Sequence, residues 1–397
     1  MSLIGTAMEL PTALVELAEK IDETIKDLLD RMISRSPERD HPLVGRLYQR
    51  IYRYLQNGGK RMHGLSVVLA YHAVGGKPRD TILPVSAGIQ LYHHHTLVHD
   101  DLYDDDQERR GESTLHEAFR LWFMDHGNVH DRQRGTGILR HSVFAGIAER
   151  KGAIAGVVYG KVVHAFAFDA ILSASFSKEQ LYDVIQTINW HDIFDNVGQM
   201  RDVLQEGDPI AEPEASLWNV YLKTGKLFEA GAICGARLGG ASDRQTAALK
   251  KWAVSSALAY QLQDDLEDIE PDSEKGVGRG IGTDLMSRKS TYLLALALQD
   301  ADAAAKEVLN RWIHYADPTS SSLVLKEVIQ AVKSSGAIEK CRQRVAQFIE
   351  EACQALDQAE PHLDPECLPL MKAFPRYFVS PAYWKRSLPE RKEPGIV

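Results

Sequence analysis

The sequence is poor in cysteine, in positive charge and in long apolar runs. Its four cysteines show no CxxC pair or zinc-ligand spacing, so reduced thiols packed as small hydrophobic side chains are expected. The formal net charge of −9 gives no indication of a basic surface that would bind nucleic acid. No run approaches the roughly 18 apolar residues of a membrane span, and residues 1–10 lack a signal-peptide pattern. We therefore expect a cytoplasmic protein with no nucleic-acid partner and no membrane span.

Strand-type alternation is also scarce, and helical periodicity takes its place from end to end. Apolar residues from Leu14 to Met32 recur at steps of three and four, which predicts an N-terminal helix over about 12–33. Further helices are predicted over residues 43–56, 64–75, 80–104, 150–173, 178–206, 214–239, 244–269, 284–300, 302–315, 320–334 and 337–358. The tail over about 361–397 has repeated prolines and is predicted to be irregular. The pattern favours a single all-α domain, 1–397, built as a helical bundle around a deep central cavity.

Two aspartate clusters far apart in the chain have nearly the same internal spacing. They are Asp100, Asp101 and Asp104, and Asp264, Asp265 and Asp268. On a helix, residues i, i+1 and i+4 lie on one side, so each cluster would direct several carboxylates to one place. Such grouping is costly without a cation, and Mg²⁺ is typically held by one or two carboxylates together with substrate phosphate oxygens. Two facing clusters suggest a magnesium–diphosphate site, although either cluster alone is also typical of a solvated helix end.

Cationic side chains occur in short motifs around these clusters. The motifs are Lys60-Arg61 after two glycines, Arg109-Arg110-Gly111, Lys223-Thr224-Gly225 and the single Lys289. Glycine lets the backbone approach a ligand closely, and guanidinium groups can hold phosphate with two hydrogen bonds. Each motif alone also fits a surface turn or a surface lysine. Their combination with the acidic clusters favours a diphosphate-binding site.

Seven segments occur in one order over roughly residues 43–300. They are GGKRMHG (58–64), His93, HDDLYDDDQERRG (99–111), GQMRD (198–202), KTGKLF (223–228), YQLQDDLED (260–268) and GTDLMSRKST (282–291). Together they resemble the trans-type isoprenyl diphosphate synthases, which make farnesyl, geranylgeranyl and longer diphosphates. The collinear set is far more specific than a single DDxxD motif.

The resemblance implies an isoprenoid-synthase-type all-α fold, a homodimer, and a prenyltransferase reaction. Isopentenyl diphosphate would be joined to an allylic diphosphate, namely dimethylallyl, geranyl or farnesyl diphosphate. Three Mg²⁺ ions bridging the acidic clusters would withdraw electrons from the allylic diphosphate, so that its C–O bond breaks. The isopentenyl double bond would then attack the allylic cation, and the released pyrophosphate is the expected proton acceptor.

The resemblance also assigns roles to residues. The six aspartates of the two clusters match metal ligands. The diphosphate-binding positions are Arg109, Lys223 and Lys289 for the allylic substrate, and Lys60, His93 and Arg110 for isopentenyl diphosphate, with Arg61 and His63 in the same motif as Lys60. Thr224 and Gln261, together with Lys223, match catalytic positions, where hydroxyl and amide dipoles could stabilise the carbocation. Gln199 and Asp202 match a motif usually packed behind the cavity.

The sequence departs from the family pattern at several places. His63 replaces a cation by an imidazole, and we expect Arg61 to compensate. Gly280 stands where a lysine is usual, and Lys161 replaces an aspartate without an evident reason. The chain is also longer than the family needs before Gly160, which predicts an insert over about 118–150. This insert fits a tolerated surface loop, and a lid or a dimer contact is the alternative.

Product length is expected to depend on side chains beneath the first acidic cluster. His95 and Thr96 stand one helical turn before Asp100, and Tyr92 stands two turns before it. In the family, bulky aromatic residues at the one-turn positions stop chain growth early. We therefore expect a short product, with twenty carbons favoured over fifteen.

Three other interpretations stay open. His93, His94 and His95 with His99-Asp100 also fit an all-α metal phosphohydrolase of the HD type, which leaves the second cluster unexplained. A terpene cyclase of the same fold would ionise a single allylic diphosphate, and the missing cations at His63 and Gly280 favour it. The isopentenyl-diphosphate positions and the intact second DDxxD favour the synthase. A non-catalytic partner subunit would not need both metal motifs complete.

Overall fold

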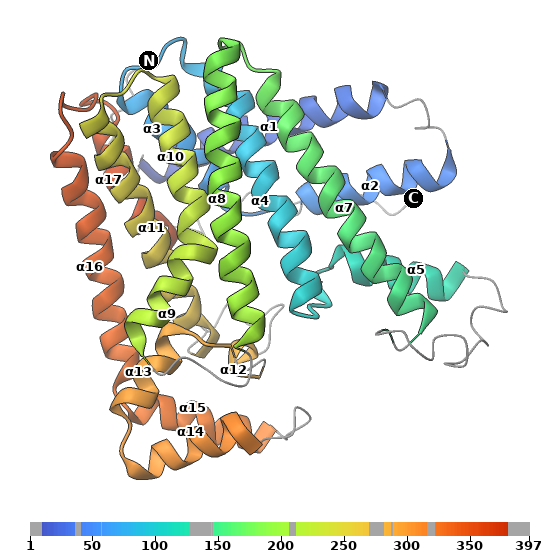
Figure 1. Cartoon of the computed structure of the whole chain (residues 1–397), viewed down its shortest axis with the longest axis vertical. Coiled ribbons are helices and arrows are strands. Elements are labelled where there is room, and N and C mark those ends of the chain that lie inside the picture. The colour runs from blue at the N-terminus through green and yellow to red at the C-terminus, as the bar shows by residue number, and fades with distance from the viewer. Residues whose placement is uncertain are drawn as a thin grey trace.

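The structure is a computed structural model, and it describes residues 10–35, 41–56, 58–126, 144, 146–205, 212–269, 282–286, 289–315 and 322–379. The described residues are almost entirely helical, which confirms the predicted all-α fold (Figure 1). The helices of the N-terminal half are α1 (Leu10–Arg35), α2 (Pro42–Gln56), α3 (Met62–Ala73), η1 (Arg79–Ile82), α4 (Leu83–Tyr103), α5 (Leu115–His126), α7 (Ile147–Leu172) and α8 (Lys178–Leu204). Those of the C-terminal half are α9 (Pro213–Val220), η2 (Tyr221–Gly225), α10 (Lys226–Leu238), α11 (Asp243–Ile269), α12 (Thr283–Met286), α13 (Tyr292–Asp300), α14 (Ala303–Tyr315), α15 (Ser322–Ser334), α16 (Ala337–Asp357) and α17 (Leu368–Val379).

The long helices α4, α7, α8, α10, α11 and α16 run roughly along the long axis of the molecule (Figure 1). Helix α4 packs between α3 and α7, α10 packs on α3, α8 and α11, and α11 packs on α16. One hydrophobic core fills the space between α1, α3, α4, α7, α10, α11 and α17. A second core joins the C-terminal half of α11 to α13, α14, α15 and α16. The helices that carry the two acidic clusters, α4 and α11, are thus held rigidly by packing along their length.

A glycine allows α4 to approach α7 closely. A Cβ atom on Gly88 would lie 2.5 Å from a side-chain carbon of Ile171 and 2.7 Å from the carbonyl oxygen of Ala167. Carbon atoms in contact prefer separations of about 3.5–4.0 Å, so a larger side chain at this position would push the helices apart. The glycine therefore fixes the position of α4 relative to α7.

A short hairpin follows α4 and turns the chain back toward it. Strand β1 (Glu108–Arg109) pairs with β2 (Glu112–Ser113), with Glu108 opposite Ser113. The turn residues Arg110 and Gly111 have φ angles of 56° and 76°. Two positive φ angles are typical of the tight turns that suit the twist of a hairpin, and glycine adopts them without strain. The hairpin directs Arg109 back toward the end of α4.

The predicted irregular tail over 361–397 contains a helix, so that prediction was wrong for Leu368–Val379. Helix α17 lies against α11, where Trp252 Nε1 donates to the Met371 carbonyl oxygen at 3.1 Å and the Trp252 ring packs on Phe374. Proline at position 375 and the prolines around the helix obscured its periodicity in the sequence. Residues 380–397 lie outside the described residues.

The other predicted boundaries differ from the structure in a few places. In place of one helix over 284–300 the structure has α12, which ends at Met286, and α13, which begins at Tyr292, with residues 287 and 288 outside the described residues. The helix predicted over 214–239 is interrupted by the π-helical η2. Helix α5 occupies the start of the predicted insert over 118–150 and was not predicted. Residues 127–143 and 145 of that insert lie outside the described residues.

One described helix, α7, is long and apolar enough to cross a membrane by length and composition alone. Charged residues interrupt the apolar sequence of α7, so it contains no uninterrupted apolar run of that length. Its residues Val163, Ala167 and Ile171 are completely buried, and α7 packs on α4 and α5. Helix packing within the bundle therefore accounts for part of its apolar character.

Candidate active site

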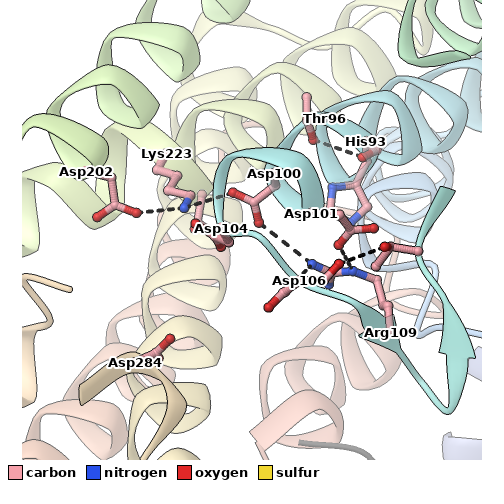
Figure 2. Close-up of polar contacts among 12 residues, drawn as sticks. His93, Thr96, Asp100, Asp101, Asp104, Asp106, Arg109, Asp202, Lys223 and Asp284 are labelled. Atoms are coloured by element: carbon pink, nitrogen blue, oxygen red, sulfur yellow. Dashed lines mark hydrogen bonds and ion pairs between the residues drawn. The ribbon is translucent and has the colours of Figure 1, made fainter. Parts of the chain in front are cut away.

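The first acidic cluster lies at the C-terminal end of α4. Asp100 and Asp101 are in its last turn, and Asp104 is the C-cap residue, whose N–H donates to the Asp100 carbonyl at 2.9 Å. This end of a helix carries partial negative charge, so carboxylates there need cations nearby. Lys223 Nζ lies 3.0 Å from Asp100 Oδ1, and Lys289 Nζ lies 2.5 Å from Asp104 Oδ2. Figure 2 shows Asp100 pointing toward Lys223, with Asp104 beside it.

Asp101 faces away from the other two carboxylates of its cluster. It is completely buried, and it accepts hydrogen bonds from Tyr54 Oη at 3.0 Å and from Arg109 Nε. Burial raises the pKa of Asp101 to about 6, although the Arg109 guanidinium acts in the opposite direction. Asp101 was predicted as a metal ligand, whereas its position here fits a residue that orients Arg109 (Figure 2). Arg109 Nη2 in turn lies 3.8 Å from Asp100 Oδ2.

The second acidic cluster occupies the last two turns of α11. Asp265 is buried and accepts a hydrogen bond from Gln261 Nε2 at 3.2 Å. Burial raises its pKa well above the usual range, and the nearby carboxylates of Asp284, Asp264 and Asp268 act in the same direction. Crowded carboxylates of this kind repel one another, and a divalent cation would relieve that repulsion.

Lys289 connects the two clusters on one side. Besides its contact with Asp104, its Nζ lies 3.8 Å from Asp284 Oδ1. The backbone N–H of Asp284 donates to Asp268 Oδ2 at 3.2 Å, so Asp284 is anchored to the second cluster. The end of α4 and the end of α11 are therefore joined through one lysine and one aspartate.

Lys223 and Thr224 connect the clusters on the other side. Lys223 Nζ lies between Asp100 and Asp202, 2.8 Å from Asp202 Oδ2 (Figure 2). Thr224 Oγ1 donates to Gln261 Oε1 at 3.2 Å, and Gln261 Nε2 in turn donates to Asp265. The structure thus brings together the three residues that were predicted as catalytic and places them between the two acidic clusters.

A second group of cations surrounds the loop at Gly58 and Gly59. Arg110 Nη1 donates to the Gly58 carbonyl at 2.5 Å, and a Cβ atom on Gly59 would lie 2.7 Å from nitrogens of both Arg110 and Arg61. Local desolvation lowers the pKa of Arg110, and the neighbouring Arg61 and Arg109 guanidinium groups add to this effect. Like charges held this close favour an anion nearby. Lys60 Nζ donates to the Phe378 carbonyl of α17 at 3.0 Å, which brings the C-terminal helix to the same loop.

Arg61 and His63 are placed differently from the prediction that they contact a diphosphate. Arg61 is only 3% exposed, and its guanidinium bonds to Asp22 of α1 and to the Leu55 carbonyl, so it ties the loop to the N-terminal helix. The His63 ring is buried between His93 and Phe228, with ring centroids 3.9 and 4.1 Å away. Burial lowers the pKa of His63 to about 3. His63 therefore supplies no positive charge for a diphosphate. Arg61 affects the loop by anchoring it to α1.

Tyr92 and His95, two of the three residues predicted to limit product length, lie on the side of α4 that contacts α7. Tyr92 and His95 are buried, and their rings are 5.1 Å apart. His164 of α7 joins them, with its ring centroid 5.4 Å from Tyr92 and 4.9 Å from His95. Thr96 Oγ1 donates back to the His93 carbonyl at 2.9 Å. The structure therefore groups Tyr92 and His95 with a ring from α7, which the sequence did not predict.

The acidic residues fit a hard divalent cation. Their donors are all carboxylate oxygens, which is the chemistry that Mg²⁺ prefers. In the described part of the chain, no three acidic, histidine or cysteine side chains already enclose a common point. Mg²⁺ is typically held by one or two carboxylates, and the oxygens of a bound diphosphate complete its shell.

Sequence reasoning missed two residues of this site. Tyr54 of α2 lies 47 positions before its partner Asp101, and a lone tyrosine in an amphipathic helix carries no signal of such a contact. Asp284 lies within the segment GTDLMSRKST, so its motif was recognised but its carboxylate was not singled out. Asp202 was expected behind the cavity, and its contact with Lys223 gives it a direct place beside the first cluster.

Comparison with known proteins gives one consistent picture. A family model described as "Polyprenyl synthetase" matches residues 45–332. The "Short chain isoprenyl diphosphate synthase" of Methanothermobacter thermautotrophicus is 26% identical over 359 residues, which cover 90% of this chain and 93% of that protein. The "Farnesyl diphosphate synthase" of Geobacillus stearothermophilus is 31% identical over 257 residues, 64% of this chain and 75% of that protein.

Solved structures show the same likeness in the fold. A geranylgeranyl pyrophosphate synthase from Corynebacterium glutamicum, complexed with isoprenyl diphosphate and magnesium, aligns with a TM-score of 0.79 at 23% identity, covering 92% of this chain and 99% of that one. A geranylgeranyl pyrophosphate synthetase from Pyrococcus horikoshii aligns with a TM-score of 0.74 at 25% identity, covering 94% and 98% of the two chains.

Proposed function

This chain belongs to the polyprenyl synthetase family of trans-prenyltransferases, and from this premise we propose that it joins isopentenyl diphosphate to an allylic diphosphate to make a short prenyl diphosphate. The observation that carries the proposal is the pair of lysines, Lys223 and Lys289, held between the two acidic clusters. This alternation of cations and carboxylates suits a metal-bound diphosphate, because a metal held by the carboxylates would neutralise them and the lysines would bind the remaining phosphate oxygens.

The proposed roles follow from these positions. Arg109, Lys223 and Lys289 hold the allylic diphosphate, and Mg²⁺ ions bound by Asp100, Asp104 and the second cluster would neutralise its charge as the C–O bond breaks. The electron pair of that bond leaves with pyrophosphate. Thr224 and Gln261 are proposed to stabilise, through their hydroxyl and amide dipoles, the positive charge that develops on the allylic carbon.

The second substrate is proposed to bind at the Gly58–Gly59 loop. Lys60 and Arg110 provide the charge for isopentenyl diphosphate, and His93 provides a neutral ring nitrogen, since burial holds its pKa well below the usual value. The double bond of isopentenyl diphosphate attacks the allylic carbon, and the proton that is then lost goes to the released pyrophosphate. No protein base is needed for this step.

Purified protein supplied with Mg²⁺, isopentenyl diphosphate and dimethylallyl, geranyl or farnesyl diphosphate in turn tests the proposal. Linear diphosphates longer than the starter, identified by mass, are the expected result. Cyclic hydrocarbon formed from a single allylic diphosphate would show a terpene cyclase instead, a role that the uncharged His63 would suit.

We propose a short product, with twenty carbons ahead of fifteen, because the buried rings of Tyr92 and His95 pack with the His164 ring of α7 one to two helical turns before the first cluster. Replacing Tyr92 or His95 with alanine removes ring volume there, so products should become longer by one or more five-carbon units. Mass spectrometry of the products gives the measurement. Unchanged product lengths in both variants would exclude these side chains from the end of the chain-binding region.

We also propose that two copies of this chain form a dimer through α8. Trp190, Ile193, Val197, Met200 and Leu204 are between 47% and 74% exposed, and they recur at alternating steps of three and four. That spacing is the pattern of helices packed against each other as a coiled coil. Ile154, Val157 and Val158 of α7 are exposed as well, and α7 and α8 lie at the front of the molecule in Figure 1.

A charge in this apolar row should separate the dimer. Met200→Glu places a carboxylate where apolar surface would be buried, so light scattering should report the mass of one chain, 44.3 kDa, in place of two. Leu121→Glu is the matched control, because Leu121 is an exposed apolar residue of α5 outside the row. A single-chain mass for the unaltered protein would contradict the proposal.

A further inference from the structure

A buried carboxylate that the proposed reaction does not use lies next to the segment carrying Lys223 and Thr224. Glu229 of α10 is 3% exposed and has four polar partners. Tyr221 Oη donates to it at 2.6 Å, and Lys250 Nζ lies at 2.7 Å. Lys226 Nζ and His191 Nε2 each lie at 3.3 Å.

These partners come from η2 itself and from three of the helices that pack on it, α8, α10 and α11. His191 belongs to α8, Lys250 to α11, and Tyr221 is the first residue of η2. A buried carboxylate is expensive unless charged and hydrogen-bonding groups surround it. Burial acts to raise the pKa of Glu229, but its partners lower it overall, so the group is a carboxylate at neutral pH. The arrangement is therefore a fully satisfied cluster that fastens α8, α10 and α11 to the start of η2.

The shape of η2 determines where Lys223 and Thr224 point. The N–H of Lys226 donates to the Tyr221 carbonyl, five residues back, so the turn is wider than in an α-helix. In an α-helix of 3.6 residues per turn, neighbouring side chains diverge by about 100°. The wider turn reduces this angle, and both residues reach the site, Lys223 toward Asp100 and Thr224 toward Gln261.

The Tyr221 ring is part of the same geometry. A Cβ atom on Gly225 would lie 2.8 Å from a carbon of this ring, so the ring closes over the end of the π-turn. Lys226 Nζ lies over the same ring, 4.6 Å from its centroid. Because the Tyr221 hydroxyl is held by Glu229, a shift of Glu229 would release the ring from the turn.

We propose that Glu229 is a positioning residue: by holding Tyr221 it keeps η2 in the π-turn that directs Lys223 and Thr224 together into the site. The inference rests on the proposed function of Lys223 but concerns residues that no sequence motif identified as functional. It implies that Glu229 and Tyr221 affect catalysis by positioning Lys223.

Glu229→Gln and Tyr221→Phe test this with nearly unchanged side-chain volume. Outer-shell partners of a functional group typically contribute about 10–100-fold, so Glu229→Gln should lower kcat by that factor, with Tyr221→Phe lowering it less. The KM for isopentenyl diphosphate should stay near the wild-type value, because that site lies at the other loop. Exposed Glu350→Gln on α16 is the matched control and should behave as the unaltered enzyme.

A double-variant cycle distinguishes positioning from general stability. In the Lys223→Met background, the roughly 10–100-fold loss of kcat caused by Glu229→Gln should shrink to less than about threefold. A merely structural role would instead lower the melting temperature and leave kcat per folded molecule unchanged in both backgrounds. Calorimetric binding of inorganic pyrophosphate with Mg²⁺ gives a readout without turnover, and Glu229→Gln should weaken it.

The assays have separate outcomes that would contradict the proposed function or the inference. Unaltered protein that makes no elongated product overturns the proposed function, and pyrophosphate binding then still tests the inference. Elongation by the unaltered protein together with wild-type kcat in Tyr221→Phe and Glu229→Gln overturns the inference alone. If Glu229→Gln does not fold, Tyr221→Phe carries the same comparison.

Discussion

Replacing Asp100 with asparagine should lower kcat/KM by at least about 10³-fold, because the substitution removes a carboxylate charge that is proposed to hold a metal ion at the diphosphate. The pKa of Asp100 is about 2: burial would raise it, but Lys223, Lys289 and Arg109 outweigh that effect. Asp100 is therefore ionised at neutral pH and available to a divalent cation. The neutral amide keeps the shape of the side chain but binds Mg²⁺ far more weakly, since a full negative charge is lost.

Asp105→Asn is the matched control for this variant. Asp105 belongs to the same run of aspartates, yet it is exposed and lies five residues further along the chain. Its φ angle of 53° is one that asparagine tolerates well, so the change should not disturb the backbone. Steady-state rates at saturating Mg²⁺ provide the comparison. Similar losses in both variants would mean that the acidic run matters only through its total charge.

Lys223→Met should lower kcat by about 10²–10³-fold, the effect expected for removing one preorganised group that stabilises developing charge. Burial would lower the pKa of Lys223, but Asp100 and Asp202 raise it overall, so the ammonium group is retained. Without it, the leaving pyrophosphate loses a cation, and Asp100 and Asp202 each lose one ion-pair partner. Because that charge is needed most as the C–O bond breaks, the loss should appear mainly in kcat. Single-turnover rates with geranyl diphosphate separate it from product release.

Lys340→Met provides the control for losing a lysine from an ion pair. Lys340 Nζ lies 2.8 Å from Asp300 Oδ2, but the lysine is largely exposed. Exposed pairs contribute little to stability or function, so activity should be unchanged. A Lys223→Met enzyme with wild-type kcat would contradict the assignment of Lys223 to the leaving group.

Helical periodicity and motif order were enough to place α4 and α11 and the acidic clusters at their ends. These features are local, because the spacing of apolar residues and the i, i+1, i+4 pattern are set by helix geometry. That the two clusters face each other was also predicted from the sequence, because a resemblance over seven segments implies the arrangement of the helices in the family fold.

Contacts between distant residues could not be predicted in the same way. Arg61 follows two glycines as a ligand-binding cation would, and only the position of α1 reveals that its partner is Asp22. Asp101 belongs to the same acidic motif as Asp100, yet hydrogen bonds from Tyr54 of α2 and Arg109 of the hairpin hold its carboxylate away from the rest of the cluster. The π-turn at Tyr221–Gly225 depends on Glu229 and its partners from three helices. In each case tertiary contacts decide which way a side chain points.

Binding of Mn²⁺ in the presence of inorganic pyrophosphate, followed by electron paramagnetic resonance, tests most directly whether the two clusters act as one site. The account predicts that pyrophosphate strengthens Mn²⁺ binding, and that Asp100→Asn and Asp268→Asn each abolish this strengthening while Asp105→Asn preserves it. Undiminished, pyrophosphate-dependent binding in Asp268→Asn would show that the end of α11 takes no part and would contradict the account.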